Sequence, residues 1–164
     1  MKNTKAFFIT QAAIIAAIYV VLTFAVNAFD LANGAIQVRI SEALTILPFF
    51  TPAAVPGLFV GCLLSNFITG APLWDVIFGS LATLLGALGT YFLRKHKWLA
   101  PIPPIISNIL IVPPVLYYAY GLPGSIPLFM LTVGIGEVIS CGILGMLLLF
   151  LLQKYRHVIF QQNK

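Results

Sequence analysis

Apolar residues in this chain gather into six long segments, separated by short stretches rich in turn-forming residues. The connecting stretches carry the Gly, Pro, Asn and Asp residues that typically end helices. A membrane-spanning helix requires about 20 mostly apolar residues, and most of the segments approach or reach that length. The segments are Phe8 to Ala28, Ile36 to Phe50, Ala53 to Thr69, Trp74 to Leu93, Ile102 to Tyr120 and Ile126 to Gln153. This pattern predicts an all-α integral membrane bundle of six transmembrane helices.

The composition agrees with a membrane protein. Hydrophobic residues make up 60% of the chain and charged residues 8%, and the mean hydropathy is +1.03. Soluble domains carry about 25% charged residues. We therefore expect a single transmembrane domain over residues 1–164. The apolar run that follows Lys2 and Lys5 resembles a signal peptide, but it is as long as a membrane span and ends in no small-x-small cleavage site, so we expect a retained first helix.

Positive charge is concentrated in three short clusters at the ends of apolar segments. They hold eight of the nine basic residues: Lys2 and Lys5; Arg94, Lys95 and Lys97; and Lys154, Arg156 and Lys164. With six spans and a cytoplasmic N-terminus, all three clusters lie on the cytoplasmic side, as the positive-inside rule requires. We therefore predict cytoplasmic N- and C-termini, with Asp30, Asp75 and the loop at 121–125 facing outward. The net charge of +5 then reflects topology and does not indicate nucleic-acid binding.

Small residues recur at helical spacing in three of the segments. In lipid, such ridges let helix backbones approach closely, so they predict helix–helix contacts. The ridges are Ala53, Gly57, Gly61 and Ser65 in the third segment, Gly79, Ala82, Gly86 and Gly89 in the fourth, and the overlapping pairs of Ala12, Ala13, Ala16 and Ala17 in the first. Packing inside the bundle is the expected role for most of them.

The second segment carries an arginine and a glutamate three positions apart in a chain with few charges. On an α-helix, Arg39 and Glu42 fall on the polar side of the segment, opposite its aliphatic residues. A charge at mid-membrane costs on the order of 3 kcal/mol, so both should face protein or a water-filled cavity. Two interpretations stay open: a structural ion pair that fixes this helix in the bundle, or a polar ligand site near the outer surface.

Other isolated polar residues could converge on the same site. Asn66, Asn108 and Glu137 lie inside apolar segments, and Trp74 with Asp75 lies at the outer mouth of the fourth. Glu137 stands between glycine and serine positions in an otherwise apolar span, where solvation by water is not expected. Each also has a structural interpretation: an interhelical hydrogen bond for the amides and Glu137, and an interfacial anchor beside a helix N-terminal charge for the Trp74–Asp75 pair.

Common catalytic motifs are missing from the chain. It contains no G-x-x-x-x-G-K-[ST] phosphate loop, no HExxH and no GxSxG, so no catalytic residue is predicted. Cys62 and Cys141 lie inside apolar runs, and neither has a further Cys or His nearby. We therefore expect both to be packing residues, with neither a disulfide nor a metal site.

The stretch IQVRISEALTILPFFTPAAVPGLFVGCLLSNF, followed by DVIFGSLATLLGAL, closely resembles the QueT family of queuosine-precursor transporters, and the resemblance runs over essentially the whole chain. It implies a six-helix substrate-binding S component of an energy-coupling-factor (ECF) transporter in the bacterial cytoplasmic membrane. Such a subunit binds its substrate from outside, docks on a transmembrane scaffold subunit and topples to release substrate inward. Two cytoplasmic ATPases use the ATP, so no cofactor is expected in this chain. The matching docking positions are Ala12 and Ala16, with Ala13 and Ala17 adjacent.

The ligand that the resemblance implies is a 7-deazaguanine, such as the aminomethyl or cyano precursor (preQ1 or preQ0). A carboxylate can accept hydrogen bonds from the N1 and N2 donors of a guanine edge, and a second carboxylate could pair with an aminomethyl cation. Either Glu42 or Glu137 is expected to take the first role and the other the second. The alternatives are an S component for another small vitamin-like molecule, a membrane-embedded enzyme that acts on a lipid through Glu42 and Arg39, and a purely structural role.

Overall fold

The computed structural model describes residues 4–28 and 39–160, and all regular structure in these ranges is helical. This confirms the predicted all-α class for the described part of the chain. Four predicted features lie outside the described residues: the positions of Lys2, Asp30 and Lys164, and the start of the second segment at 36–38.

The chain forms six α-helices, together with two 3₁₀ segments and one π segment, within the described ranges. In order they are α1 (Thr4–Ala28), η1 (Ile40–Phe49), α2 (Ala54–Ile68), α3 (Leu73–Phe92), η2 (Lys97–Leu99), α4 (Ile102–Tyr118), α5 (Ile126–Glu137), η3 (Val138–Leu144) and α6 (Gly145–Ile159). η1 and η2 are 3₁₀-helical, and η3 is π-helical. Four stretches are long and apolar enough to cross a membrane: Lys5–Ala28, Leu73–Phe92, Lys97–Tyr118 and Ile126–Arg156.

The predicted second span is wrong in form. Instead of a long α-helix, the structure has the 10-residue 3₁₀ segment η1, whose residues Ser41 to Pro48 are all buried. Pro48 cannot donate a backbone hydrogen bond and so interrupts a regular α-helix. At about 2 Å per residue, η1 extends about 20 Å, which is less than the hydrocarbon thickness of about 30 Å. η1 is therefore an inner element enclosed by other helices.

The small-residue ridges are confirmed as contacts inside the chain. A Cβ added at Gly57 would lie 2.7 Å from the Ala12 carbonyl oxygen, and one at Gly61 would lie 3.0 Å from that of Ala16. α1 and α2 thus pack backbone to backbone. The same holds between α3 and α4, where a Cβ at Gly86 would lie 2.6 Å from the Cα of Pro104.

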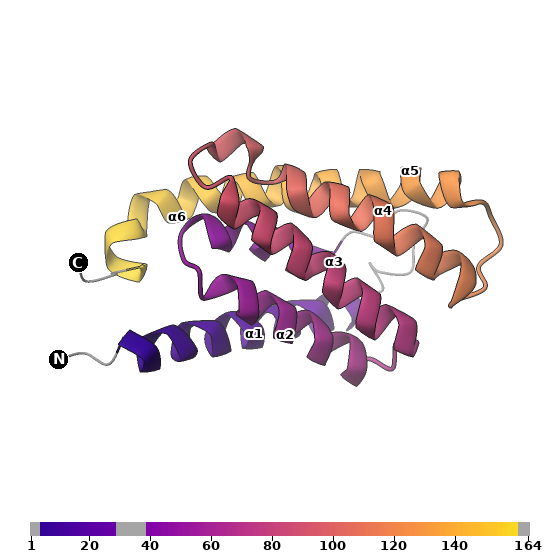
Figure 1. Ribbon diagram of the computed structural model, residues 1–164, viewed down its shortest axis with the longest axis horizontal. Helices are drawn as coiled ribbons and strands as arrows, with labels where there is room; N and C mark the ends of the chain where they lie inside the picture. Colours follow the sequence, from indigo (N-terminus) through magenta and orange to yellow (C-terminus); the bar gives the residue numbers. More distant parts are fainter. Residues whose placement is uncertain (1–3, 29–38, 161–164) are drawn as a thin grey trace.

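The helices run back and forth between two ends of an elongated bundle (Figure 1). α1 begins and α6 ends toward the same end, and the connection at 93–101 lies on that side as well (Figure 1). The connections at 69–72 and 119–125 lie toward the opposite end. The described basic clusters therefore lie toward one end of the bundle.

Candidate functional site

A cavity of about 550 Å³ lies at the end of the bundle that holds the 69–72 connection. Its volume falls within the range typical of small-molecule sites. Its lining comes from α1, the start of η1, the end of α2, the start of α3 and the end of α4: Tyr19, Thr23, Val26, Asn27, Arg39, Ser41, Asn66, Thr69, Gly70, Ala71, Pro72, Asp75, Leu116, Tyr120 and Leu122. Polar and apolar side chains share this lining, which suits an amphipathic ligand.

An arginine and an aspartate face each other in the cavity wall. Arg39 Nη2 lies 4.0 Å from Asp75 Oδ2, and the Arg39 side chain is 26% exposed whereas that of Asp75 is 4% exposed. Tyr120 donates a 2.7 Å hydrogen bond to the same oxygen of Asp75. Burial raises the pKa of Tyr120 above its ordinary value, and the hydrogen bond to Asp75 adds to the increase. Tyr120 therefore stays protonated and donates at neutral pH.

The structural ion pair of Arg39 with Glu42, one of the two interpretations of the sequence, is not found among the described residues. Among the described residues, the ion pair of Arg39 within 4.0 Å is with Asp75. Arg39 precedes η1 in an extended conformation, with φ −101° and ψ 93°, so the helical i, i+3 geometry does not apply to it. Its backbone N–H donates to the Ser140 hydroxyl at 3.1 Å, which ties the start of η1 to η3.

Glycine at position 79 makes room for the Asp75 carboxylate. A Cβ there would lie 2.8 Å from Asp75 Oδ1 and 3.2 Å from the Asn66 amide nitrogen. Asn66 in turn donates from this nitrogen to the Asp75 backbone carbonyl at 3.3 Å. Asp75 Oδ1 is buried and has no hydrogen-bond partner among the described residues. Oδ1 is thus enclosed beside Gly79, and Oδ2 is the oxygen that Arg39 and Tyr120 face.

Glu42 lies behind the cavity wall. It is buried in η1 and accepts hydrogen bonds from the Tyr19 hydroxyl and, at 3.4 Å, from the Thr83 hydroxyl. Tyr19 lines the cavity, whereas Glu42 does not. Tyr19 therefore separates the carboxylate of Glu42 from the cavity and is held in place by it.

Removing the Tyr19 hydroxyl should destabilise the fold. In Tyr19→Phe, Glu42 Oε1 keeps only the long contact with Thr83, and leaving a buried acceptor unsatisfied costs about 1–3 kcal/mol. We expect the free energy of unfolding, measured by titration with a denaturing detergent, to fall by this amount. Tyr118→Phe is the control, since Tyr118 is exposed at the end of α4. Equal stabilities for the two variants would contradict this role of the hydrogen bond.

The predicted site residues divide into three groups. Arg39, Asn66 and Asp75 line the cavity. Glu42, Asn108 and Glu137 are buried but outside the lining, and Trp74 is 58% exposed and stacks on Phe78. The sequence interpretation did not include Tyr19, Thr23 or Tyr120 among the candidate site residues. Tyr19 and Thr23 are spaced four apart among the aliphatic residues of α1, and this i, i+4 polar pair was the available signal.

The predicted docking positions also divide. Ala16 is buried, and both Ala12 and Ala16 pack against the glycines of α2, so these two positions face the interior of the chain. Ala13 and Ala17 lie on the exposed side of α1. The overlap of two small-xxx-small pairs in one helix thus reflects two faces, one turned toward α2 and one turned outward.

These features define a multi-pass helical membrane protein with a polar, small-molecule-sized cavity near one end. Residues 9–154 match the family described as QueT transporter. The chain therefore belongs to the QueT transporter family, which is a family of transporters and not of enzymes. The expectations of family and membrane location from the sequence are thereby confirmed.

A curated relative supports the same assignment. The chain is similar to the queuosine precursor transporter QueT of Lactococcus lactis subsp. cremoris (strain MG1363), with 40% identity over 99 residues. The aligned part covers 59% of this chain and 57% of the relative, so the chain matches somewhat more than half of that protein's length. No solved structure matches the chain.

Proposed function

We propose that the chain is the substrate-specific membrane subunit of an ECF-type importer and that its cavity binds a 7-deazaguanine queuosine precursor from outside. The observation that carries the proposal is the cavity itself, with the Arg39–Asp75 pair in its wall, in a member of a transporter family. The resemblance of the sequence to S components supplies the ECF part of the proposal. ATP hydrolysis is then the task of two partner ATPases, and this chain itself binds no nucleotide for that step.

The lining residues have the chemistry that a guanine-like edge requires. The Asp75 carboxylate, which is part of the cavity lining, can accept from the N1–H and N2–H donors, and the Arg39 guanidinium can donate to the O6 acceptor. Asn66 adds an amide to the same lining. In this proposal Asp75 reads the guanine edge directly, and Glu42 acts through Tyr19.

The proposed orientation places the cavity on the outer side. Lys5 lies in the first turn of α1, and Lys154 and Arg156 lie near the end of α6, at the end of the bundle opposite the 69–72 connection (Figure 1). With this basic end in the cytoplasm, the positive-inside rule is obeyed and both termini are cytoplasmic. The cavity then opens toward the outside, as uptake requires.

The exposed face of α1 is the proposed contact with the scaffold subunit. Ala13 and Ala17 are exposed there together with Ile14 and Ile18. Small side chains on an outward face permit close approach of another helix. The docking function implied by the resemblance is therefore assigned to Ala13 and Ala17.

A binding titration tests the proposed function. Purified chain in lipid nanodiscs is titrated calorimetrically with the aminomethyl and cyano deazaguanines, with guanine and with thiamine. We expect saturable binding of a deazaguanine and none of thiamine. Binding of thiamine alone would instead support an S component for another vitamin-like molecule, and binding of neither would contradict the proposal. Recovery of two ATPase subunits with the tagged chain tests the ECF part separately.

A further inference from the structure

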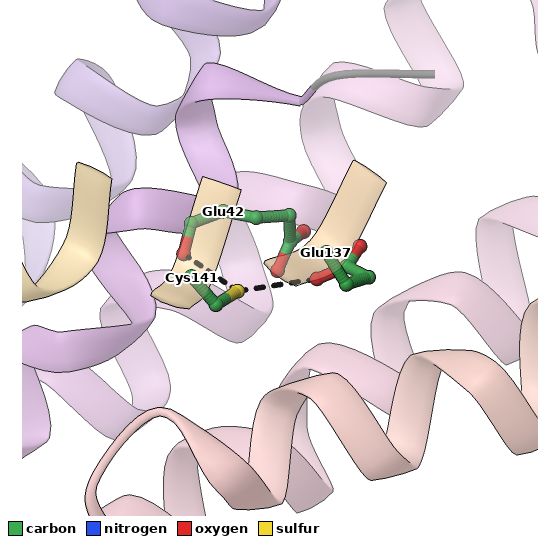
Figure 2. A group of neighbouring side chains, drawn as sticks. All are labelled: Glu42, Glu137 and Cys141. Atoms are coloured by element: carbon green, nitrogen blue, oxygen red, sulfur yellow. Dashed lines mark hydrogen bonds between the residues drawn. The ribbon is translucent and has the colours of Figure 1, made fainter. Parts of the chain in front are cut away.

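Two glutamates and a cysteine meet in the interior, away from the cavity (Figure 2). One side-chain ligand atom from each of Glu42, Glu137 and Cys141 can be chosen so that all three lie within 4.8 Å of one another, and all three residues are buried. The Cys141 thiol lies 3.1 Å from Glu137 Oε2 and 3.4 Å from the backbone carbonyl of Glu42. None of the three lines the cavity.

The cluster contains an unsatisfied acceptor. Glu42 Oε2 is buried without a hydrogen-bond partner among the described residues, whereas Oε1 accepts from Tyr19. A buried polar atom without a partner is rare in native proteins and often marks the position of a water or an ion. Two carboxylates this close, out of contact with water, also repel each other when both are ionised. A proton or a cation between the two carboxylates removes this repulsion.

The backbone at the cluster is unusual as well. The π segment Val138–Leu144 begins directly after Glu137 and contains Cys141. π-helical turns are rare and frequently occur at functional sites. Here Ser140 and Cys141 are both buried. Ser140 contacts Arg39, directly before η1, and Cys141 contacts Thr45 within η1. The π segment thus aims consecutive polar side chains at η1.

We propose that Glu42, Glu137 and Cys141 bind a divalent cation of the Zn²⁺ type, through one carboxylate oxygen of each glutamate and the sulfur of the cysteine. Carboxylate and thiolate are both Zn²⁺ ligands, and three protein ligands leave a fourth position for water. Binding releases the thiol proton, because the thiolate is the form that coordinates. The cation offsets the repulsion of the carboxylates and occupies the free accepting site of Glu42.

The ligand set selects among cations. Ca²⁺ and Mg²⁺ take oxygen ligands and six or more positions, which a buried thiol does not suit. The sequence interpretation excluded a metal because it counted only nearby Cys and His residues. The structure instead supplies two carboxylates, one from η1 and one at a position four residues before Cys141.

Co²⁺ serves as the probe in the test, because it replaces Zn²⁺ and its bonds to thiolate absorb in the near ultraviolet. The full chain without a polyhistidine tag is purified in detergent, treated with chelator and titrated with Co²⁺. We expect one Co²⁺ per chain, a sulfur-to-cobalt absorption band, and displacement by Zn²⁺ but not by Mg²⁺ or Ca²⁺. Absence of uptake by the wild-type chain would overturn the proposal and leave a shared proton between the carboxylates.

Variants assign the ligands. Cys141→Ser should abolish the band and weaken Zn²⁺ affinity by more than the roughly 10- to 100-fold typical of losing an outer-shell group. Glu137→Gln, which preserves shape, should weaken affinity while keeping the band. Cys62→Ser is the matched control, since Cys62 is also buried but lies outside the cluster, and it should bind like wild type. A band that survives Cys141→Ser or vanishes in Cys62→Ser would contradict the assigned site. Precursor binding is measured separately, so this test does not depend on the proposed function.

Discussion

Asp75→Asn should weaken precursor binding by about 100-fold. The substitution keeps the shape of the side chain but removes the charge that faces Arg39 and accepts from Tyr120. A hydrogen bond to a charged group contributes about 1.5–3 kcal/mol. Asparagine no longer offers a charged acceptor to the two N–H donors of the ligand, so we expect a loss of about 3 kcal/mol of binding free energy, or about 100-fold in affinity. Calorimetric titration of the nanodisc-embedded chain with the preferred deazaguanine measures the change.

Two controls separate recognition from folding in this experiment. Leu73→Ala alters an exposed residue near the start of the same helix, outside the cavity, and should bind within about twofold of wild type. The double variant Arg39→Met with Asp75→Asn removes the pair together and leaves no unpaired charge. If Asp75 acted only through Arg39, Asp75→Asn would cause no further loss of affinity in the Arg39→Met background, and the direct reading of the guanine edge by Asp75 would be wrong.

Gly86→Ala should destabilise the bundle, because the added methyl group has no space between α3 and α4. Its Cβ would lie 2.6 Å from the Cα and 2.9 Å from the Cβ of Pro104, and neither backbone nor ring can move aside easily. Overpacking of this kind lowers the free energy of unfolding by about 1–3 kcal/mol. Here the clash with Pro104 can be relieved only if α3 and α4 move apart. We expect the midpoint of unfolding in denaturing detergent to fall accordingly.

Gly145→Ala is the matched control for this substitution. Gly145 is also helical, but its added Cβ would meet the Ala43 carbonyl oxygen at 3.5 Å and the Ser140 carbonyl oxygen at 3.6 Å, which are ordinary contacts. Alanine also has the higher helix propensity, so this variant should be as stable as wild type or slightly more stable. A loss of stability at position 145 equal to that at position 86 would show that close approach is not the cause.

Most of the helices could be predicted from the sequence because their ends are fixed by local signals. Five of the six predicted segments match helical stretches, with bounds that differ by at most a few residues at most ends. The ends coincide with Gly and Pro residues and with a change from apolar to polar composition, and both signals act within a few positions. Segment length, however, does not reveal whether a Pro-containing run such as η1 forms an α-helix or a shorter 3₁₀ element.

The candidate site was less predictable because it depends on contacts between distant segments. The sequence left open an ion pair of Arg39 with its near neighbour Glu42, whereas the partner in the structure is Asp75 of α3, the second α-helix after Arg39. Cys141 and Glu42 likewise meet only once η1 and η3 are packed together. Helical periodicity identifies the polar face and the small-residue face of each helix, but it does not determine which neighbouring helix packs against each face. The two alanine pairs of α1 illustrate the same point.

The shortness of η1 has a consequence for how this protein enters the membrane. A 10-residue 3₁₀ element leaves backbone groups that a lipid environment does not satisfy, and it is too short to cross on its own. We therefore expect the neighbouring helices α1 and α3 to be inserted in the bilayer before η1 is transferred from water into the membrane. For η1, insertion into the membrane and folding are therefore one event.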